Sequence, residues 1–391
     1  MFKNITRTVW VISLVSLFND FSSEMLYPVI PLYLESIGYG TVLIGILEGI
    51  AEFLSGMAKI YTGSLSDSYK RRLPFVQIGY FLSVLSRPLM GLLPYAAPIV
   101  GARILDRGGK GIRSGARDAL LADESTAENR AEVFGFHRSM DTLGAVIGPL
   151  AAMLFLFFFP KNYKAIFLLT IVPGALAILC TFMIKEKKVK APKRVDFSLK
   201  KHFKYFSKAS KPYKKLLFIF LLFALVNSSD MFLIFKAKEL GMHEQHILLA
   251  YVLFNFVFAL SAFPIGRLAD KFGKINMIII GLLIYSGCYA LFGFANTEGF
   301  VYAGLILYGL YYACTDGVIK AKLLEYTQKE DKSSALGLYL GLNSISLLIA
   351  NVGAGLIWKS FGSTYLFVGT IILSLAIVLA LLLFRKNLSL G

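Results

Sequence analysis

The stretch "GSLSDSYKRR", residues 63–72, decides the fold because a second copy of it occurs half a chain later. The copy is "GRLADKFGK", residues 266–274, and its first glycine follows Gly63 by 203 residues. Gly38 and Gly241, which we expect to close the preceding helix in each half, are separated by the same interval. Landmarks that recur at one spacing indicate a chain built from two related halves.

Long apolar runs separate these landmarks. The chain is 56% hydrophobic, with a mean hydropathy of +0.65 and only 17% charged residues, whereas soluble domains are about 25% charged. Runs near twenty residues match the thickness of a bilayer core. We therefore expect an all-α polytopic membrane protein.

The first run resembles a signal peptide but has no small-residue cleavage site, so we expect a retained helix. The twelve expected spans are approximately 9–36, 41–62, 74–95, 97–121, 132–157, 163–184, 214–238, 245–268, 275–295, 299–324, 333–358 and 362–385.

The net charge of +17 is concentrated in one loop. Residues 185–215 hold thirteen Lys and Arg against Glu186 and Asp196. By the positive-inside rule this loop is cytoplasmic, and with twelve spans both termini lie on that side of a bacterial inner membrane. The loop indicates topology and attraction to anionic lipid rather than a nucleic-acid partner. The expected domains are an N-terminal bundle (1–184), a basic linker (185–213) and a C-terminal bundle (214–391).

The repeated loop resembles the signature of a known family. Gly63, Leu65, Asp67, Arg71 and Arg72 match the pattern of the loop between spans two and three in the major facilitator superfamily. The resemblance covers the whole chain and implies two pseudo-symmetric six-helix halves, alternating access and, we expect, a monomer. It also implies a conformational latch in which Asp67 holds the outward-facing state. The latch residues are Gly63, Asp67 and Arg71 in the first half and Gly266, Asp270 and Lys274 in the second.

Ionisable residues occur inside the expected spans, where each is expensive and by default indicates function. Several are four apart and share a helical face, as Asp20 and Glu24 do. The alternative for each is a structural ion pair, which we favour for Lys59, Arg87, Glu48 and Glu52 and, near the cytoplasmic end, for Arg113, Arg117 and Asp118. The expected substrate or proton pathway comprises Asp20, Glu24, Arg103, Asp106, Arg107, His137, Arg138, Asp141, Asp230, Asp316 and Lys320.

Span four, "DRGGKGIRSGARDALLAD" at residues 106–123, is the most charged of all. Its basic stripe must be enclosed by other helices or line water, and its glycines allow close helix packing. In the superfamily an arginine followed three residues later by Gln resembles a proton-transfer motif. Arg103 fits the arginine, but Asp106 replaces the Gln. The glycine-proline motif of proton-driven exporters is present only in part, at residues 144–149.

Function follows from these resemblances together. "NDFSSEMLYP" and "FGFHRSMDTLGAVIGP" resemble a bacterial branch of efflux permeases, which implies proton-coupled export of a small polar or charged solute. Alternatives are an uptake permease for an anionic metabolite or siderophore, a divalent metal-ion exporter that uses His137 with carboxylates, and a channel. An enzyme is not expected, because Lys110 in "RGGKGIRSG" is followed by Gly111 and no strand precedes it. We expect no cofactor and no resident metal.

Overall fold

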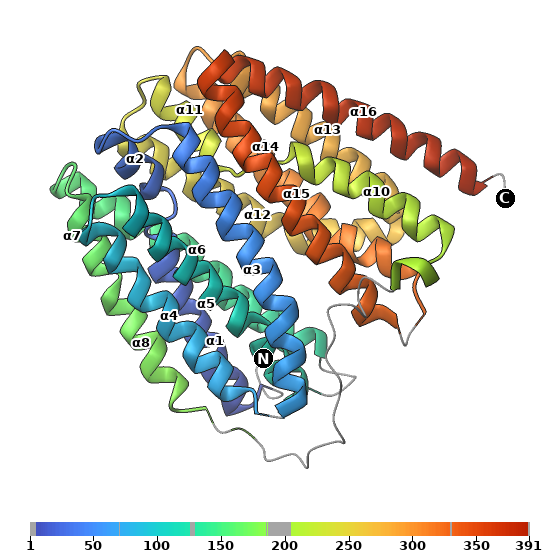
Figure 1. Ribbon diagram of the computed structural model, residues 1–391, viewed down its shortest axis with the longest axis horizontal. Helices are drawn as coiled ribbons and strands as arrows, with labels where there is room; N and C mark the ends of the chain where they lie inside the picture. The colour runs from blue at the N-terminus through green and yellow to red at the C-terminus, as the bar shows by residue number, and fades with distance from the viewer. Residues whose placement is uncertain are drawn as a thin grey trace. The chain divides into compact units, whose positions relative to one another are not determined.

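The computed structural model describes residues 5–69, 71–125, 130–184, 186, 205–328 and 331–389. Their regular secondary structure is helical throughout (Figure 1). The helices are α1 (Arg7–Glu24), α2 (Val29–Ser36), α3 (Thr41–Tyr69), α4 (Leu73–Leu92), α5 (Ala96–Asp123), α6 (Arg130–Phe158), α7 (Tyr163–Leu169), α8 (Ile171–Thr181), α10 (Lys211–Val226), α11 (Met231–Glu239), α12 (Glu244–Phe272), α13 (Lys274–Gly293), α14 (Glu298–Glu325), α15 (Lys332–Phe361) and α16 (Ser363–Ser389). Each expected span coincides with a helix or a pair of consecutive helices, which confirms the all-α fold class.

The first and seventh spans are interrupted, although we expected one helix in each. In the first, residues 25–28 separate α1 from α2, and Pro28 precedes the first helical residue of α2. Proline has no N–H to continue the α1 ladder. In the seventh, residues 227–230 separate α10 from α11, and Asn227 has a non-helical ψ of 80°. Asn, Ser and Asp favour such positions because their side chains compete for backbone hydrogen bonds. The first interruption begins at the last residue of "SSEM" (22–25), and the second contains the first three residues of "SSDM" (228–231), so each lies at or beside this repeated motif.

The second interrupted helix of each pair ends at a glycine. Gly38 after α2 has φ of +87° and Gly241 after α11 has φ of +78°. This left-handed conformation favours glycine because other residues would place Cβ too close to the backbone. Beyond α11 the N–H of Met242 donates to the carbonyl of Ala237 at 3.2 Å, as in a Schellman cap. The prediction that these glycines close their helices is confirmed.

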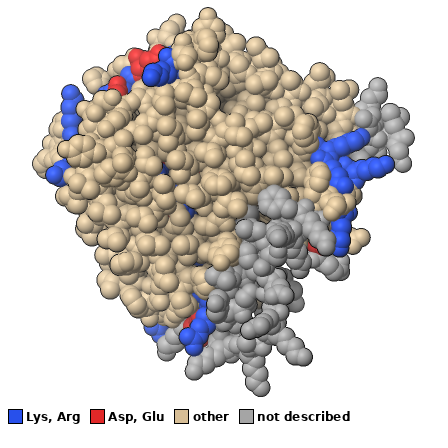
Figure 2. All heavy atoms as spheres, viewed as in Figure 1, with Lys and Arg blue, Asp and Glu red and all other residues tan. Residues whose placement is uncertain are grey.

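Among the described residues, nine helical segments are long and apolar enough to cross a membrane. The expected first, fourth and tenth spans are not among them. The fourth, α5, is excluded by its charges, since residues 103–113 include five Lys, Arg and Asp residues. On the face of the molecule shown in Figure 2, charged residues gather at the margins and the middle is almost free of them. This distribution fits a surface that faces lipid.

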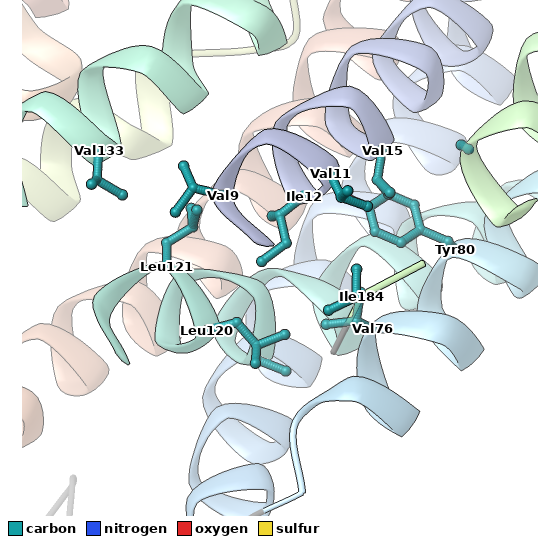
Figure 3. Packing of buried hydrophobic residues seen from close by; sticks show 12 residues of the cluster. Val9, Val11, Ile12, Val15, Val76, Tyr80, Leu120, Leu121, Val133 and Ile184 are labelled. Atoms are coloured by element: carbon teal, nitrogen blue, oxygen red, sulfur yellow. The ribbon is translucent and has the colours of Figure 1, made fainter. Parts of the chain in front are cut away.

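The chain divides into two compact units. The first comprises Met1–Ile37 with Ile50–Leu199, and the second comprises Gly38–Gly49 with Lys200–Gly391. In the first unit, one apolar core gathers side chains of α1, α4, α5 and α6, with Tyr80 and Leu121 both fully buried (Figure 3). In the second, the start of α3 packs on α15 so closely that a Cβ on Gly45 would lie 2.3 Å from the carbonyl oxygen of Asn351.

Candidate functional site

Helix α5 is held by close backbone contacts with α3 and α4. A Cβ on Gly109 would lie 2.5 Å from the carbonyl oxygen of Gly79 in α4. A Cβ on Gly111 would lie 2.6 Å from the Cβ of Ala58 in α3. Glycine is therefore required at both positions if the helices are to approach this closely. Four charged side chains of this helix, Arg103, Asp106, Arg107 and Arg113, are buried, as its sequence predicts, whereas Lys110 is exposed.

A buried charge network connects α5 with α4 and α1. Asp106 lies between two guanidinium groups, 3.3 Å from Nε of Arg87 and 3.5 Å from Nη1 of Arg103. Arg87 is only 1% exposed and donates to the side-chain and backbone oxygens of Asn19 at 2.9 and 3.3 Å. Buried charges persist when they are paired and hydrogen-bonded in this way.

The next turn of α5 continues the network. Nη1 of Arg113 donates to Oγ of Ser83 at 2.6 Å, and Ser83 Oγ donates to the carbonyl of Asp106 at 2.9 Å. The Arg113 guanidinium also lies over the Tyr80 ring, 4.6 Å from its centroid. Tyr80 and Ser16 of α1 are joined by a 3.1 Å hydrogen bond. These contacts fit the structural role expected for Arg113.

Two arginines of α5 flank an aromatic ring at the interruption of the first span. The guanidinium carbons of Arg103 and Arg107 lie 5.5 and 5.4 Å from the centroid of the Tyr27 ring. Arg107 also approaches Glu52 of α3 at 4.0 Å, the outer limit for an ion pair, and Glu52 is partly exposed. Two guanidinium groups beside one ring form a surface suited to a planar anionic group.

A second charged cluster joins α1, α5 and α6. Asp20 of α1 and Asp141 of α6 lie within electrostatic range of each other. Arg117 of α5 lies 3.8 Å from Asp141, and Arg138 lies 3.3 Å from it. Arg117 is also paired with Asp118 at 2.9 Å. Two acids and two bases from three helices therefore meet at Asp141.

Two glycines of α6 allow this helix to approach α1 closely. A Cβ on Gly144 would lie 2.4 Å from the carbonyl oxygen of Leu17 and 3.2 Å from the Cβ of Asp20. A Cβ on Gly148 would lie 2.7 Å from the carbonyl oxygen of Phe21. The partial glycine-proline motif thus allows α6 to pack on the backbone of α1, which brings Asp141 to Asp20.

His137 lies one turn before Asp141 and is buried. Its two ring nitrogens are each 3.5 Å from a serine hydroxyl of α1, Nδ1 from Ser13 and Nε2 from Ser16. Ser16 also accepts from Nη1 of Arg117 at 3.4 Å. His137 is thereby placed beside the cluster and not in an ion pair of its own.

Known proteins resemble this chain in sequence and in architecture. The sequence profile of the Major Facilitator Superfamily matches residues 12–243 and 216–389. The chain belongs to the major facilitator superfamily. An uncharacterized MFS-type transporter of Methanocaldococcus jannaschii is 30% identical over 97% of this chain and 95% of its own length. The chain is thus a multi-pass membrane transporter and not an enzyme.

Two further relatives are more distant. The tetracycline resistance protein, class H, of Pasteurella multocida is 27% identical over 38% of this chain and 36% of its own length. The crystal structure of a POT family transporter in complex with 5-aminolevulinic acid has a TM-score of 0.82 and 14% identity, and covers 97% of this chain and 96% of its own. At that identity the likeness shows the major facilitator fold alone.

In the second half of this major facilitator protein, the expected site residues are dispersed. Asp230 is buried and forms the N-cap position of α11 at the interruption of the seventh span. Asp316 and Lys320 pair with each other at 2.8 Å on α14, and both side chains are 40% or more exposed. An exposed pair of this kind contributes little to stability.

The latch residues are described only in part. The side chains of Asp67 and Asp270 lie outside the described residues, as does the surrounding stretch 63–70. Arg72 forms an ion pair with Asp123 at the end of α5, and Lys274 forms one with Glu325 at the end of α14, at 2.9 Å. Lys274 follows Arg72 by 202 residues, and Glu325 follows Asp123 by the same interval. The repeat therefore extends to an ion pair in each half.

Glu325 lies at the loop end of α14, where the chain leaves the span. Partial burial acts to raise the pKa of this carboxyl, but hydrogen bonds from Lys322 and Lys274 outweigh it and hold the pKa below its usual value. The Glu325 carboxyl is therefore ionised, and can pair with Lys274, at every pH at which a glutamate side chain is normally ionised.

One residue of the site escaped the sequence analysis, and two others were expected there only as structural residues. Arg117, expected to be structural, forms ion pairs with Asp118 and Asp141. Asn19 is uncharged and gave no signal, although its amide joins Arg87 to Asp20 through bonds of 2.9 and 3.1 Å. Arg87 was assigned to a structural pair, and its burial and its contact with Asp106 agree with that role.

An apolar pocket of about 460 Å³ lies elsewhere in the first unit, between α1, α6 and α8. Phe18, Phe155 and Leu176 are among the residues that line it, and its lining carries no charged side chain. The charged site is therefore not this pocket. Among the described residues no group of three or more His, Cys, Asp or Glu side chains could hold a metal ion.

Proposed function

We propose that this chain is a proton-coupled exporter of a small anionic or otherwise polar solute, working by alternating access as a monomer in a bacterial inner membrane. The observation that carries the proposal is the charged cluster at Asp141, where Arg117 and Arg138 lie 3.8 and 3.3 Å away and the close packing of Gly144 brings Asp20 of α1 near. Two neighbouring carboxylates repel each other when both are ionised, so such a pair can share a proton.

Proton uptake would change the partners of Arg117. When the Asp20–Asp141 pair carries two negative charges, it attracts the Arg117 guanidinium; one added proton weakens that attraction, and Asp118, already at 2.9 Å, becomes the stronger partner. Arg117 also donates to Ser16 of α1 at 3.4 Å. A change at this one guanidinium therefore acts on α1, α5 and α6 together, which links proton binding to helix movement.

The solute would bind beside the Tyr27 ring. Arg103 and Arg107 supply two guanidinium groups there, and the contact of Arg107 with Glu52 is long, at 4.0 Å. A carboxylate solute can take both nitrogens of a guanidinium fork. The resemblance of "NDFSSEMLYP" and "FGFHRSMDTLGAVIGP" to a bacterial branch of efflux permeases supports export as the direction. No observation in the described residues favours the divalent metal-ion alternative over an anion.

The orientation and the latch complete the proposal. The basic residues of the loop 185–215 support a cytoplasmic position for that loop and for both termini. The linker 185–213 would join bundles 1–184 and 214–391, and Asp67, with its second-half counterpart Asp270, would stabilise the outward-facing state.

The test uses proteoliposomes with a trapped pH-sensitive dye. A panel of mono- and dicarboxylates, with the matching neutral amides, is screened for solute-dependent proton movement. We expect proton flux with at least one carboxylate and none with its amide, and we expect Asp20→Asn and Asp141→Asn to abolish it. Glu298→Gln, which removes a carboxylate from an exposed pair with His246, is the control and should retain it. Unchanged flux in the Asp20→Asn, Asp141→Asn double variant would refute the proposed coupling.

A further inference from the structure

The apolar pocket of about 460 Å³ in the first unit is a groove that is open on one side. Met25 and Pro173 are buried parts of its lining, whereas Leu154, Phe158 and Val172 are 58%, 65% and 61% exposed. Two of its walls, α6 and the pair α7–α8, belong to segments that are long and apolar enough to cross a membrane. The open side of the groove therefore faces the hydrocarbon of the bilayer.

Glycine contacts fix two of the helices that form the groove. A Cβ on Gly148 of α6 would lie 2.7 Å from the carbonyl oxygen of Phe21, so α6 is held against α1. A Cβ on Gly174 of α8 would lie 2.6 Å from Cγ1 of Val84, so α8 is held against α4. Neither helix can move across the groove and fill it without losing this close packing. The groove is therefore a fixed feature of the first unit.

The length and width of the groove fit one hydrocarbon chain. Its lining includes Phe159, the residue after α6, and Leu176 of α8. From Tyr163, at the start of α7, to Leu176 the helices rise by about 20 Å, compared with about 15 Å for half of the hydrocarbon core. The groove thus extends from the loop 159–162 to the middle of the bilayer. Over about 20 Å of helix, a volume of about 460 Å³ leaves a cross-section of about 23 Å², which admits a single file of methylene groups.

Two exposed lysines lie at the loop end of the groove. Lys161 follows Phe159 by two residues, so their Cα atoms are at most about 7.6 Å apart, and the N–H of Asn162 donates to the carbonyl of Phe159 at 3.3 Å. Lys164 is in the first turn of α7. No acidic residue occurs between Phe159 and Leu169, and neither lysine has an ion-pair partner in the part of the chain that the structure describes. Two ammonium groups are therefore available to an anion beside the groove.

The backbone of Lys161 supports a role for its side chain. With φ of 59°, it is the only described residue other than glycine that has a positive φ. Glycine or asparagine adopts this conformation more easily than a lysine does. A residue held in a disfavoured conformation indicates a function beyond the turn that it forms.

We propose that this groove binds one acyl chain of an anionic phospholipid, and that Lys161 and Lys164 bind its phosphate. The apolar lining excludes the polar end of the lipid, which is therefore placed at the loop, where the two lysines lie. Basic side chains at the end of membrane helices attract anionic head groups in this way. The lipid belongs to the leaflet on the side of the loop 159–162.

The competing occupant is an apolar solute that the protein transports. Sites for such solutes contain a few polar groups that fix the orientation of the ligand, and the side chains that line this groove are all apolar. The open side also gives lipid chains direct access from the bilayer. The lipid site does not rest on the proposed export activity or on Asp20 and Asp141, so it can be tested without a solute.

The experiment measures thermal unfolding of the purified, delipidated full chain in detergent. Phosphatidylglycerol is titrated against phosphatidylcholine with the same acyl chains. We expect a saturable rise in the unfolding temperature with phosphatidylglycerol, since a ligand that binds only the folded state stabilises it. For phosphatidylcholine we expect a half-saturating concentration about tenfold or more higher, since a charge-assisted contact is worth that much. An equal response to the two lipids would refute recognition of the head group.

Two substitutions test the lysines. Lys161→Asn keeps a residue that tolerates the positive φ, and Lys164→Gln keeps a long polar side chain, so the double variant should be at least as stable as wild type in detergent alone. Its preference for phosphatidylglycerol over phosphatidylcholine should disappear. Lys359→Gln, at an exposed lysine in the last turn of α15, is the matched control and should retain the preference. An unchanged preference in the double variant would place the head group elsewhere and refute this part of the site.

A third substitution tests the groove itself. Ala151→Phe fills the lining from α6, so it should fold and should lose the response to both lipids. Ala376→Phe adds the same side chain at an exposed position of α16, outside the groove, and should respond as wild type does. Equal lipid responses in the two variants would mean that the acyl chain does not lie in the groove, and would refute the proposal.

Discussion

Removal of the Asp106 carboxylate tests the logic of the buried network most directly. Asp106 is the anion between Arg87 and Arg103, at 3.3 and 3.5 Å, and all three side chains are less than 10% exposed. Asp106→Asn therefore leaves two buried cations without their anion. Loss of one partner from a buried pair typically lowers the free energy of unfolding by about 3–5 kcal/mol, and we expect this variant at the upper end because two cations lose their partner.

Arg87→Met is the informative comparison. It leaves Arg103 and Asp106 as a neutral pair and removes two hydrogen bonds to Asn19, so it should cost less, about 1–3 kcal/mol. In the double variant Arg87→Met, Asp106→Asn only one cation remains. Its loss of stability should therefore be smaller than the sum of the single losses by about 1–3 kcal/mol.

The assay is denaturant unfolding of the four proteins in detergent, monitored by the fraction that elutes as a monodisperse peak. The reasoning fails if Asp106→Asn is as stable as wild type, or if the two changes are additive within error. Either result would mean that water or another charge compensates the arginines and that the pairing seen here does not stabilise the protein.

Two further predictions concern the same half of the molecule. Gly144→Ala should lower the free energy of unfolding by about 1–3 kcal/mol, because its Cβ would lie 2.4 Å from the Leu17 carbonyl oxygen. Gly108→Ala is the control, because nothing lies within 4 Å of its Cβ, and it should be neutral or stabilising by up to about 1 kcal/mol. Equal thermal stability of the two variants would contradict the close packing of α6 on α1. Arg107→Ala should leave stability nearly unchanged, since its Glu52 partner is partly exposed, but should abolish carboxylate-dependent proton flux, whereas Arg117→Ala should lower both; full flux in the Arg107 variant would remove Arg107 from solute binding.

Sequence patterns predict the fold well because hydropathy and repeated landmarks act along the chain. Gly38 and Gly241 illustrate this, since the interval between them identified two halves and both have the positive φ expected of a helix end. The interruptions at 25–28 and 227–230 were not predicted. Pro28 and the residues from Asn227 to Asp230 do favour a break in a helix. Each break is only four residues long, however, and the apolar sequence on both sides of it reads as one continuous span.

The site was predicted less completely, because its composition depends on which helices meet at which depth. Spacing on one helix placed Asp20 with Glu24, yet the structure places Asp20 near Asp141 of α6. Arg117 was assigned by its distance from the span centre, but the glycine packing of α6 on α1 brings Asp141 to it. A contact between helices depends on their relative rotation, which periodicity within one helix does not record.

The enclosed charges of α5 also have a consequence for biogenesis. Each charge at the centre of an isolated helix opposes membrane insertion by about 2.5–3.5 kcal/mol, and α5 carries Arg103, Asp106, Arg107 and Arg113 in buried positions. Such a helix cannot enter lipid alone as it leaves the ribosome. It must be retained by the insertion machinery until α4 presents Gly79, α3 presents Ala58 and Arg87 meets Asp106. Substitutions at Gly79 or Gly109 should therefore appear first as degradation of newly made chains.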